Sequence, residues 1–145
     1  MKYLVLPHGI NPEIGTPNSA GIDFFVPTDF RDTLLEPMGN VIIPTRVKVI
    51  IPEGFSGIFY NRSSVGSKGV ILGAKVVDSD YRGEVFINLI NISDKGFLIS
   101  PRMKIAQMVV SKCRTDLERI ELTEYEKYST IRNNGALGST NKGDL

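Results

Sequence analysis

Three observations in the 145-residue sequence predict an all-β domain, either a sandwich or a barrel of short strands. First, its 14 glycines and 8 prolines are scattered between short β-branched runs, which is typical of strands joined by tight turns. Second, long amphipathic helices are hard to find. Third, the run from Val85 to Ile92 carries apolar side chains on both pleat faces, so we expect a central strand that is covered on both sides.

Short runs rich in β-branched and aromatic residues are expected to form the strands. In chain order they are Tyr3 to Leu6, Ile22 to Val26, Val41 to Ile43, Arg46 to Ile51, Phe55 to Tyr60, Val70 to Leu72, Val76 to Asp78, Val85 to Ile92, Phe97 to Ile99 and Ile105 to Ser111. Helical turns are expected only in Ser63 to Gly69 and Leu117 to Tyr128, and the second segment is equally compatible with a strand and a loop. The last segment, Ser129 to Leu145, is poor in bulky apolar residues, so alone it should be mobile.

Length and composition narrow the class of protein. The length fits one domain, and 41% hydrophobic residues can build a core. The formal net charge of +1 does not favour nucleic acid or an anionic membrane as a partner, although a few local cations could bind a small anion. The single cysteine, Cys113, cannot form an intrachain disulfide, and there is no cysteine and histidine set for zinc. With no signal peptide or membrane span recognisable, we expect a cytoplasmic protein, or one inside the host cell if it is viral.

The segment from Gly73 to Glu84 brings an acid, an aromatic ring and turn-forming residues together. Asp78 closes the β-branched run Val76-Val77 and precedes a turn at Ser79-Asp80. A carboxylate fixed at a strand end can act as a general base toward a water molecule that is held beside an electrophile. Alternatively, the two aspartates are turn residues that accept local backbone hydrogen bonds.

A second segment, from Arg62 to Gly69, combines a guanidinium, several hydroxyls and glycines near a possible helix start. Such a segment can present backbone donors, hydroxyls and a forked positive charge to phosphate oxygens. An ordinary surface turn rich in serine and glycine would have the same composition. Each of these segments is ambiguous alone, and their order along the chain is more informative.

Five segments, taken in order, resemble the motifs of the deoxyuridine triphosphate nucleotidohydrolase (dUTPase) family. They are Ser19-Ala20-Gly21-Ile22-Asp23-Phe24, Arg62-Ser63-Ser64, the run from Gly73 to Glu84, Arg102-Met103-Lys104-Ile105-Ala106-Gln107, and Arg132-Asn133-Asn134-Gly135-Ala136-Leu137-Gly138-Ser139-Thr140. Together they span nearly the whole chain and are far more specific than any one. The resemblance implies a distorted jelly-roll subunit, with a catalytic domain over residues 1–128 and a flexible C-terminal arm over 129–145 that closes over an active site.

The resemblance implies that the third motif holds the nucleoside and the attacking water. Asp78 would activate the water, and Tyr81 would pack under the deoxyribose and exclude a ribose 2'-hydroxyl by shape. A hairpin that includes Gly73, Lys75 and Val76 would read the uracil edge with its backbone. Lys75 stands where a glycine is common in the family.

The second and fourth motifs are expected to hold the phosphates. By resemblance, Ser63 contacts the oxygens near the scissile α,β bond, and Arg62 supports the phosphates or a subunit contact. Ser64 stands at the usual glycine. Gln107 is expected to hydrogen-bond the phosphates, and Lys104 occupies the place of a usual arginine. Without the resemblance, Gln107 could be a polar residue that faces solvent.

The first and fifth motifs complete the expected site. Asp23 is implied near the site or its metal-linked water, and without the resemblance it could be an ordinary strand-opening aspartate. Leu137 replaces the phenylalanine that usually stacks on uracil, so it would cover the base without a π face. The remaining residues of the fifth motif are expected to close over the triphosphate: Arg132, Gly138, Ser139 and Thr140.

The implied reaction converts dUTP and water to dUMP and pyrophosphate by attack at the α-phosphorus. It would limit uracil in DNA and supply dUMP for dTMP synthesis. Mg2+ is expected on the phosphate oxygens and waters rather than directly on protein ligands. The resemblance also implies a homotrimer whose active sites are shared between subunits.

Two other functions of the same fold are alternatives. A dCTP deaminase usually carries an arginine where this chain has Ser67 and a catalytic glutamate where it has Asn88, and an amide cannot cycle the proton that deamination requires. A non-catalytic nucleotide-sensing or binding protein would not need Asp78.

A phosphate-binding P-loop is excluded, because the glycine-rich tail lacks the lysine and the following helix that such a loop requires.

Overall fold

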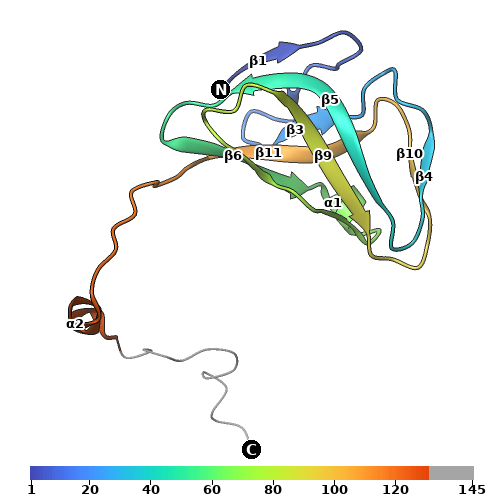
Figure 1. Cartoon of the computed structure of the whole chain (residues 1–145). Coiled ribbons are helices and arrows are strands. Elements are labelled where there is room, and N and C mark those ends of the chain that lie inside the picture. Colours follow the sequence, from blue (N-terminus) through green and yellow to red (C-terminus); the bar gives the residue numbers. More distant parts are fainter. Residues whose placement is uncertain (131–145) are drawn as a thin grey trace, which may run out of the picture. The chain divides into compact units, whose positions relative to one another are not determined.

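The computed structural model describes residues 1–130, and the chain divides into two compact units, Met1–Arg114 and Thr115–Leu145. Every strand of Figure 1 lies in the first unit. In the described part of the second unit the chain forms only the short helix α2 (Leu122–Tyr125) and the 3-10 turn η1 (Glu126–Tyr128). The helical alternative for this segment is therefore confirmed, while the arm boundary at residue 129 stays a prediction.

The strands of the first unit form three antiparallel sheets. A four-stranded sheet has the order β1 (Lys2–Val5), β5 (Asn40–Ile50), β9 (Glu84–Asn91), β7 (Val70–Leu72). A five-stranded sheet has the order β2 (Glu13–Ile14), β3 (Ile22–Phe25), β11 (Lys104–Lys112), β6 (Phe55–Asn61), β8 (Val76–Val77). A further pair joins β10 (Phe97–Ile99) to β4 (Thr33–Leu35). One helical turn, α1 (Ser63–Gly66), follows β6. The all-β prediction is confirmed, with separate sheets in place of a closed barrel among residues 1–130.

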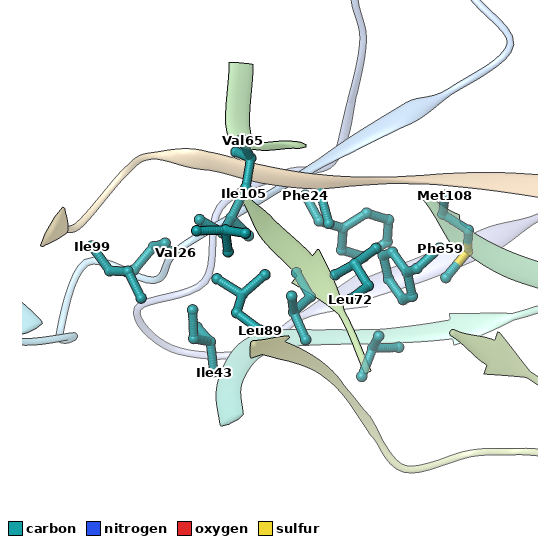
Figure 2. Close-up of a cluster of buried hydrophobic side chains, with 14 of the residues drawn as sticks. Phe24, Val26, Ile43, Phe59, Val65, Leu72, Leu89, Ile99, Ile105 and Met108 are labelled. Atoms are coloured by element: carbon teal, nitrogen blue, oxygen red, sulfur yellow. The ribbon is translucent and has the colours of Figure 1, made fainter. Parts of the chain in front are cut away.

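The hydrophobic core lies between the four-stranded and the five-stranded sheets. Figure 2 shows Phe24 and Phe59 from the five-stranded sheet beside Leu72 and Leu89 from the four-stranded sheet. The two phenylalanine rings meet edge to face, with 5.0 Å between their centroids. Because alternate residues of each strand enter this core, the opposite faces remain available for other contacts.

Two of the expected strands are one. Val41 to Ile43 and Arg46 to Ile51 were predicted separately, but β5 runs through both, with a register shift between Pro44 and Lys48. The interruption is a bulge at Arg46, whose φ of 59° lies in the left-handed region. β2 and β4 were not predicted, because strands of two and three residues carry no periodic signal and form only by pairing with β3 and β10.

The prediction that β9 is covered on both sides was wrong for the single chain. Val85, Ile87 and Leu89 are buried, but Phe86 on the opposite pleat face is 48% exposed. Apolar residues that are at least partly exposed continue this face along β9 and onto β5 and β7, and together they form what we call the outer face: Ile42, Ile71, Phe86 and Ile90. Within residues 1–130, this face of β9 is apolar and is left at least partly exposed.

Candidate active site

One cavity collects the residues that the sequence predicts to bind phosphates. It has a volume of about 380 Å³, and its lining includes Asp23, Arg62, Ser63, Ser64 and Gln107. These side chains come from β3, from the turn between β6 and α1, and from β11, which are neighbours in the five-stranded sheet. We call it the polar cavity.

The turn after β6 presents the two serines. Val65 is only 2% exposed and anchors α1 to the core, while Ser63 and Ser64 on the same turn are exposed. The Asn61 side chain donates a hydrogen bond to the carbonyl of Val70 at 2.5 Å, which ties the start of the turn to β7. Burial of one apolar residue in a short helix therefore directs two hydroxyls outward.

A buried carboxylate in the polar cavity pairs with two cations, of which only Arg62 lines the cavity. Asp23 is 7% exposed, and its two oxygens lie 3.0 Å from Arg62 Nε and 3.2 Å from Lys104 Nζ. Lys104 also meets Glu13 at 3.1 Å, and hydrogen bonds to Glu13 and then to Asp23 raise the pKa of Lys104 above its ordinary value. Asp23 thus orients both cations and is no simple strand-opening residue.

Gln107 faces this cavity rather than solvent alone. Its side-chain amide donates to the carbonyl of Asn61 at 3.0 Å. Its Oε1 atom lies so close to Gly21 that a Cβ at that position would overlap it. The glycine in the first motif therefore leaves room for the fourth-motif glutamine in its present position.

A second cavity, of about 180 Å³, contains the residues predicted to hold water and sugar. Asp78, Tyr81, Glu84 and Phe86 line it, together with the valines of β8 and the start of β9. Asp78 is exposed and closes a turn in which the Tyr81 N–H donates to its carbonyl at 3.2 Å. We call this the tyrosine cavity.

The segment predicted to read the base is not a simple hairpin. β7 pairs with β9 in one sheet, whereas β8 pairs with β6 in the other, so the chain from Gly73 to Lys75 crosses between sheets. Val70 and Leu72 are buried in the core, whereas β8 is an edge strand and Val76 is 66% exposed.

Asn88 is a residue of this region that sequence reasoning did not place in the site. The Gly73 N–H donates to the Asn88 carbonyl at 2.9 Å, and a Cβ at Gly73 would lie 2.7 Å from Asn88 Nδ2. Within residues 1–130, Asn88 Oδ1 is a buried side-chain acceptor without a partner. No sequence pattern signals such an atom, because its burial depends on the crossing segment above it.

The two cavities have no lining residue in common. Within one chain, Asp78 and Tyr81 therefore line a different cavity from Arg62, Ser63 and Gln107. The fifth-motif residues Arg132, Leu137, Gly138, Ser139 and Thr140 lie outside the described residues.

The donor set does not offer a direct metal cage. Within residues 1–130 no group of three histidine, cysteine, aspartate or glutamate side chains could hold a metal ion, and Asp23 is occupied by two cations. Phosphate oxygens would have to supply the ligands for Mg2+ here. In the same part of the chain, no helix has the length and apolarity needed to cross a membrane.

Comparisons with known proteins agree on one family. The dUTPase family model matches residues 8–141. The chain is similar to the deoxyuridine 5'-triphosphate nucleotidohydrolases of Finegoldia magna, at 37% identity over 97% of this chain and 99% of that one, and of Dictyoglomus turgidum, at 37% over 89% and 88%.

Solved structures give the same result. A mutant of the Staphylococcus bacteriophage 80alpha dUTPase, solved with dUpNHpp, superposes with a TM-score of 0.81 at 25% identity, covering 96% of each chain. A mutant dUTPase from phage phi11 of S. aureus, described with a structural Mg(II) ion, gives 0.74 at 27% identity over 85% of this chain and 97% of that one. The chain belongs to the dUTPase family.

Proposed function

We propose that this protein is a dUTP diphosphatase, which hydrolyses dUTP to dUMP and pyrophosphate. Membership of the dUTPase family supports the activity. The observation that carries the assignment is the tyrosine cavity, in which a carboxylate, Asp78, and an aromatic ring, Tyr81, are held by one turn. This is the pair needed to deliver a water molecule beside a deoxyribose.

In the proposed reaction, Asp78 accepts a proton from a water molecule whose oxygen attacks the α-phosphorus. A new P–O bond forms to the α-phosphorus, the bridging α,β P–O bond breaks, and pyrophosphate leaves with the bond's electron pair. Ser63, Arg62 and Gln107 bind the phosphate oxygens from the polar cavity, where Asp23 fixes the guanidinium. Mg2+ bound to the phosphates would neutralise charge on the triphosphate.

The nucleoside is recognised by shape and by backbone. The Tyr81 ring packs under the deoxyribose and leaves no room for a 2'-hydroxyl. Backbone groups of Gly73, Lys75 and Val76 that are not bonded within the chain bind the uracil edge. The arm over residues 129–145 closes over the nucleotide, where Arg132, Gly138, Ser139 and Thr140 bind the triphosphate and Leu137 covers the base.

We further propose that the protein is a homotrimer with shared active sites. The outer face is apolar and exposed, whereas its sequence is that of a strand covered on both sides. Phe86 belongs to the outer face and also lines the tyrosine cavity. A subunit that covers this face can therefore bring its polar cavity toward the Asp78 of its neighbour.

Ile42→Glu is expected to convert the trimer to monomers of about 16.0 kDa, because a charge at the centre of an apolar interface must be desolvated without a partner. Ile42 is 62% exposed in the single chain, so the substitution should leave the subunit folded. Sedimentation velocity measures the mass, and Leu98→Glu is the matched control, since Leu98 is 55% exposed but lies on the β4–β10 pair. A wild-type protein that is already monomeric, or an unchanged mass for Ile42→Glu, would contradict the proposed interface.

The activity is tested by supplying dUTP and dCTP separately with Mg2+ and measuring pyrophosphate and ammonia. We expect pyrophosphate from dUTP and no ammonia from dCTP, because Asn88 cannot act as the acid and base of a deamination. Ammonia from dCTP would instead identify a deaminase. Neither product, with nucleotide still bound, would identify a non-catalytic nucleotide-binding protein.

A further inference from the structure

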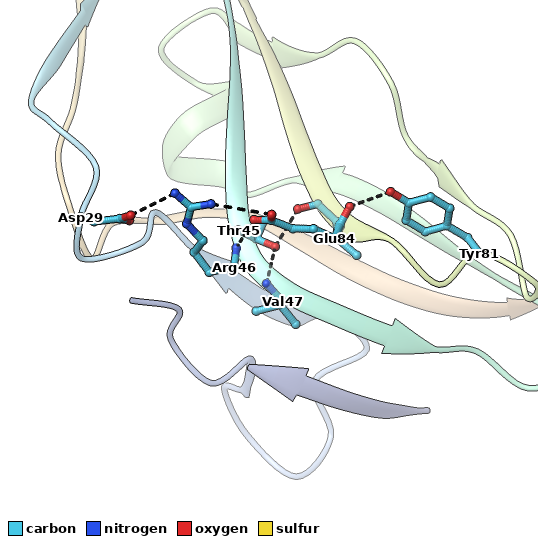
Figure 3. Close-up of polar contacts among 7 residues, drawn as sticks. Asp29, Thr45, Arg46, Val47, Tyr81 and Glu84 are labelled. Atoms are coloured by element: carbon cyan, nitrogen blue, oxygen red, sulfur yellow. Dashed lines mark hydrogen bonds and ion pairs between the residues drawn. The ribbon is translucent and has the colours of Figure 1, made fainter. Parts of the chain in front are cut away.

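Glu84, at the start of β9, makes contacts with both its backbone and its side chain. Its carbonyl oxygen accepts a hydrogen bond from the Tyr81 hydroxyl at 2.7 Å. Its carboxylate accepts the backbone N–H of Arg46 through Oε1 at 2.7 Å, and Oε2 lies 3.8 Å from the Arg46 guanidinium. Figure 3 shows the resulting chain of contacts from Asp29 through Arg46 and Glu84 to Tyr81.

This contact lies where the pairing of β5 with β9 is irregular. β5 and β9 lose their regular register between Pro44 and Lys48, where Arg46 has a φ of 59°. In that gap the carboxylate of Glu84 takes the Arg46 N–H, and the Thr45 hydroxyl donates to the carbonyl of Val85 at 2.7 Å. Glu84 still pairs with Lys48 in the ladder, and the side chains of Glu84 and Thr45 hold β9 against β5 where the register shifts.

Arg46 is itself held in place on its other side. Its guanidinium donates to Asp29 at 3.0 Å, and this hydrogen bond lowers the pKa of Asp29 below its ordinary value. The Arg46 carbonyl accepts the N–H of Leu6 at 2.8 Å. A left-handed arginine with partners on its N–H, its carbonyl and its side chain has little freedom to move.

The Tyr81 hydroxyl is fixed by its hydrogen bond to the Glu84 carbonyl. The ring lies directly over Gly83, where a Cβ would overlap it. Tyr81 is 41% exposed, so packing around it is incomplete. The hydrogen bond to the Glu84 carbonyl therefore decides where the ring stands in the tyrosine cavity.

We propose that Glu84 and Arg46 are positioning residues that fix the Tyr81 ring and so determine how strongly the protein discriminates deoxyribonucleotides from ribonucleotides. The inference rests on the proposed function, in which Tyr81 excludes the 2'-hydroxyl. Exclusion by shape requires that the Tyr81 ring keeps its position, because a displacement of about 0.5 Å is enough to loosen such a site. The carboxylate of Glu84 acts on the substrate only through the position of the ring.

The test compares kcat/KM for dUTP and UTP in the wild type and in Glu84→Ala. We expect the ratio of dUTP to UTP to fall about tenfold, because the ring can then move aside for the extra hydroxyl. Tyr81→Phe removes the hydrogen bond but keeps the ring, so it should lower the ratio similarly. Adding Glu84→Ala to Tyr81→Phe should then have no further effect, since both act through one contact. A purely structural role would lower kcat/KM for both nucleotides equally.

Two further variants keep the result unambiguous. Glu84→Gln retains an oxygen for the Arg46 N–H and is expected to lower the ratio less, and it decides the question if Glu84→Ala does not fold. Asp29→Ala removes the other ion pair of Arg46 but leaves the Arg46 N–H bound to Glu84, so it should lower the ratio less than Glu84→Ala does. The proposal is overturned if folded Glu84 variants keep the wild-type ratio, if Asp29→Ala lowers it as much as Glu84→Ala, or if the wild type turns over dUTP without discriminating against UTP. A wild type that releases no pyrophosphate from dUTP would overturn the proposed function instead.

Discussion

Asp78→Asn is expected to lower kcat for dUTP by about a thousandfold, because an amide cannot accept the proton of the attacking water. The side chain keeps its shape and lies exposed in the turn before Tyr81, so nucleotide binding should change little. Pyrophosphate release measures the loss, and calorimetric titration of the variant with dUTP measures the binding.

Asp80→Asn is the matched control for this prediction. Asp80 belongs to the same turn and carries the same charge, but it lines a different cavity with Glu53 and Arg82. We expect it to retain most of the activity. Normal turnover by Asp78→Asn, or a larger loss of activity in Asp80→Asn, would contradict the assignment of Asp78 as the general base.

Two inactive variants are expected to recover dUTP hydrolysis when they are combined in one trimer. Asp78→Asn impairs the tyrosine cavity, and a Ser63→Ala, Gln107→Ala double variant impairs the polar cavity, which has no lining residue in common with it. If each site takes the two cavities from different subunits, random mixing leaves about one site in four with both intact. Unfolding the two proteins together, refolding them and measuring pyrophosphate release should therefore give about a quarter of the wild-type activity.

The control mixes Asp78→Asn with Tyr81→Ala. Both residues line the same cavity of one chain, so no combination of subunits can produce an intact copy. We expect no recovery in this mixture. Equal behaviour of the two mixtures would contradict sites that are shared between subunits.

The sequence predicts best those parts of the fold in which local pattern and tertiary packing agree. β6, β7, β10 and β11 were expected almost as they are, because their apolar residues alternate into the core. The prediction for the outer face was wrong, since apolar residues on two sides of β9 do not show that the same chain covers both sides. The left-handed backbone at Arg46 could not be predicted either, because a residue in that conformation is expected to be glycine. The partners that stabilise the arginine there are far away in the sequence.

Sequence reasoning grouped several of the candidate phosphate-binding residues correctly in space, while their roles stay predictions. Asp23, Arg62, Ser63 and Gln107 do gather in one cavity, although they lie up to 84 residues apart in the chain. The order of the motifs could not indicate that Asp78 and Tyr81 would line a separate cavity of the same chain. Glu13 and Asn88 also contact this machinery, and only the pairing of strands brings them there.

At Arg46, the stability of the fold and the selectivity for deoxyribose favour different residues. A non-glycine residue in the left-handed region costs about 1–2 kcal/mol, which Arg46→Gly would recover. The same change would remove the guanidinium that faces Asp29 and Glu84. A selection for heat resistance alone would therefore favour glycine at this position, and the protein that results would accept more of the wrong sugar.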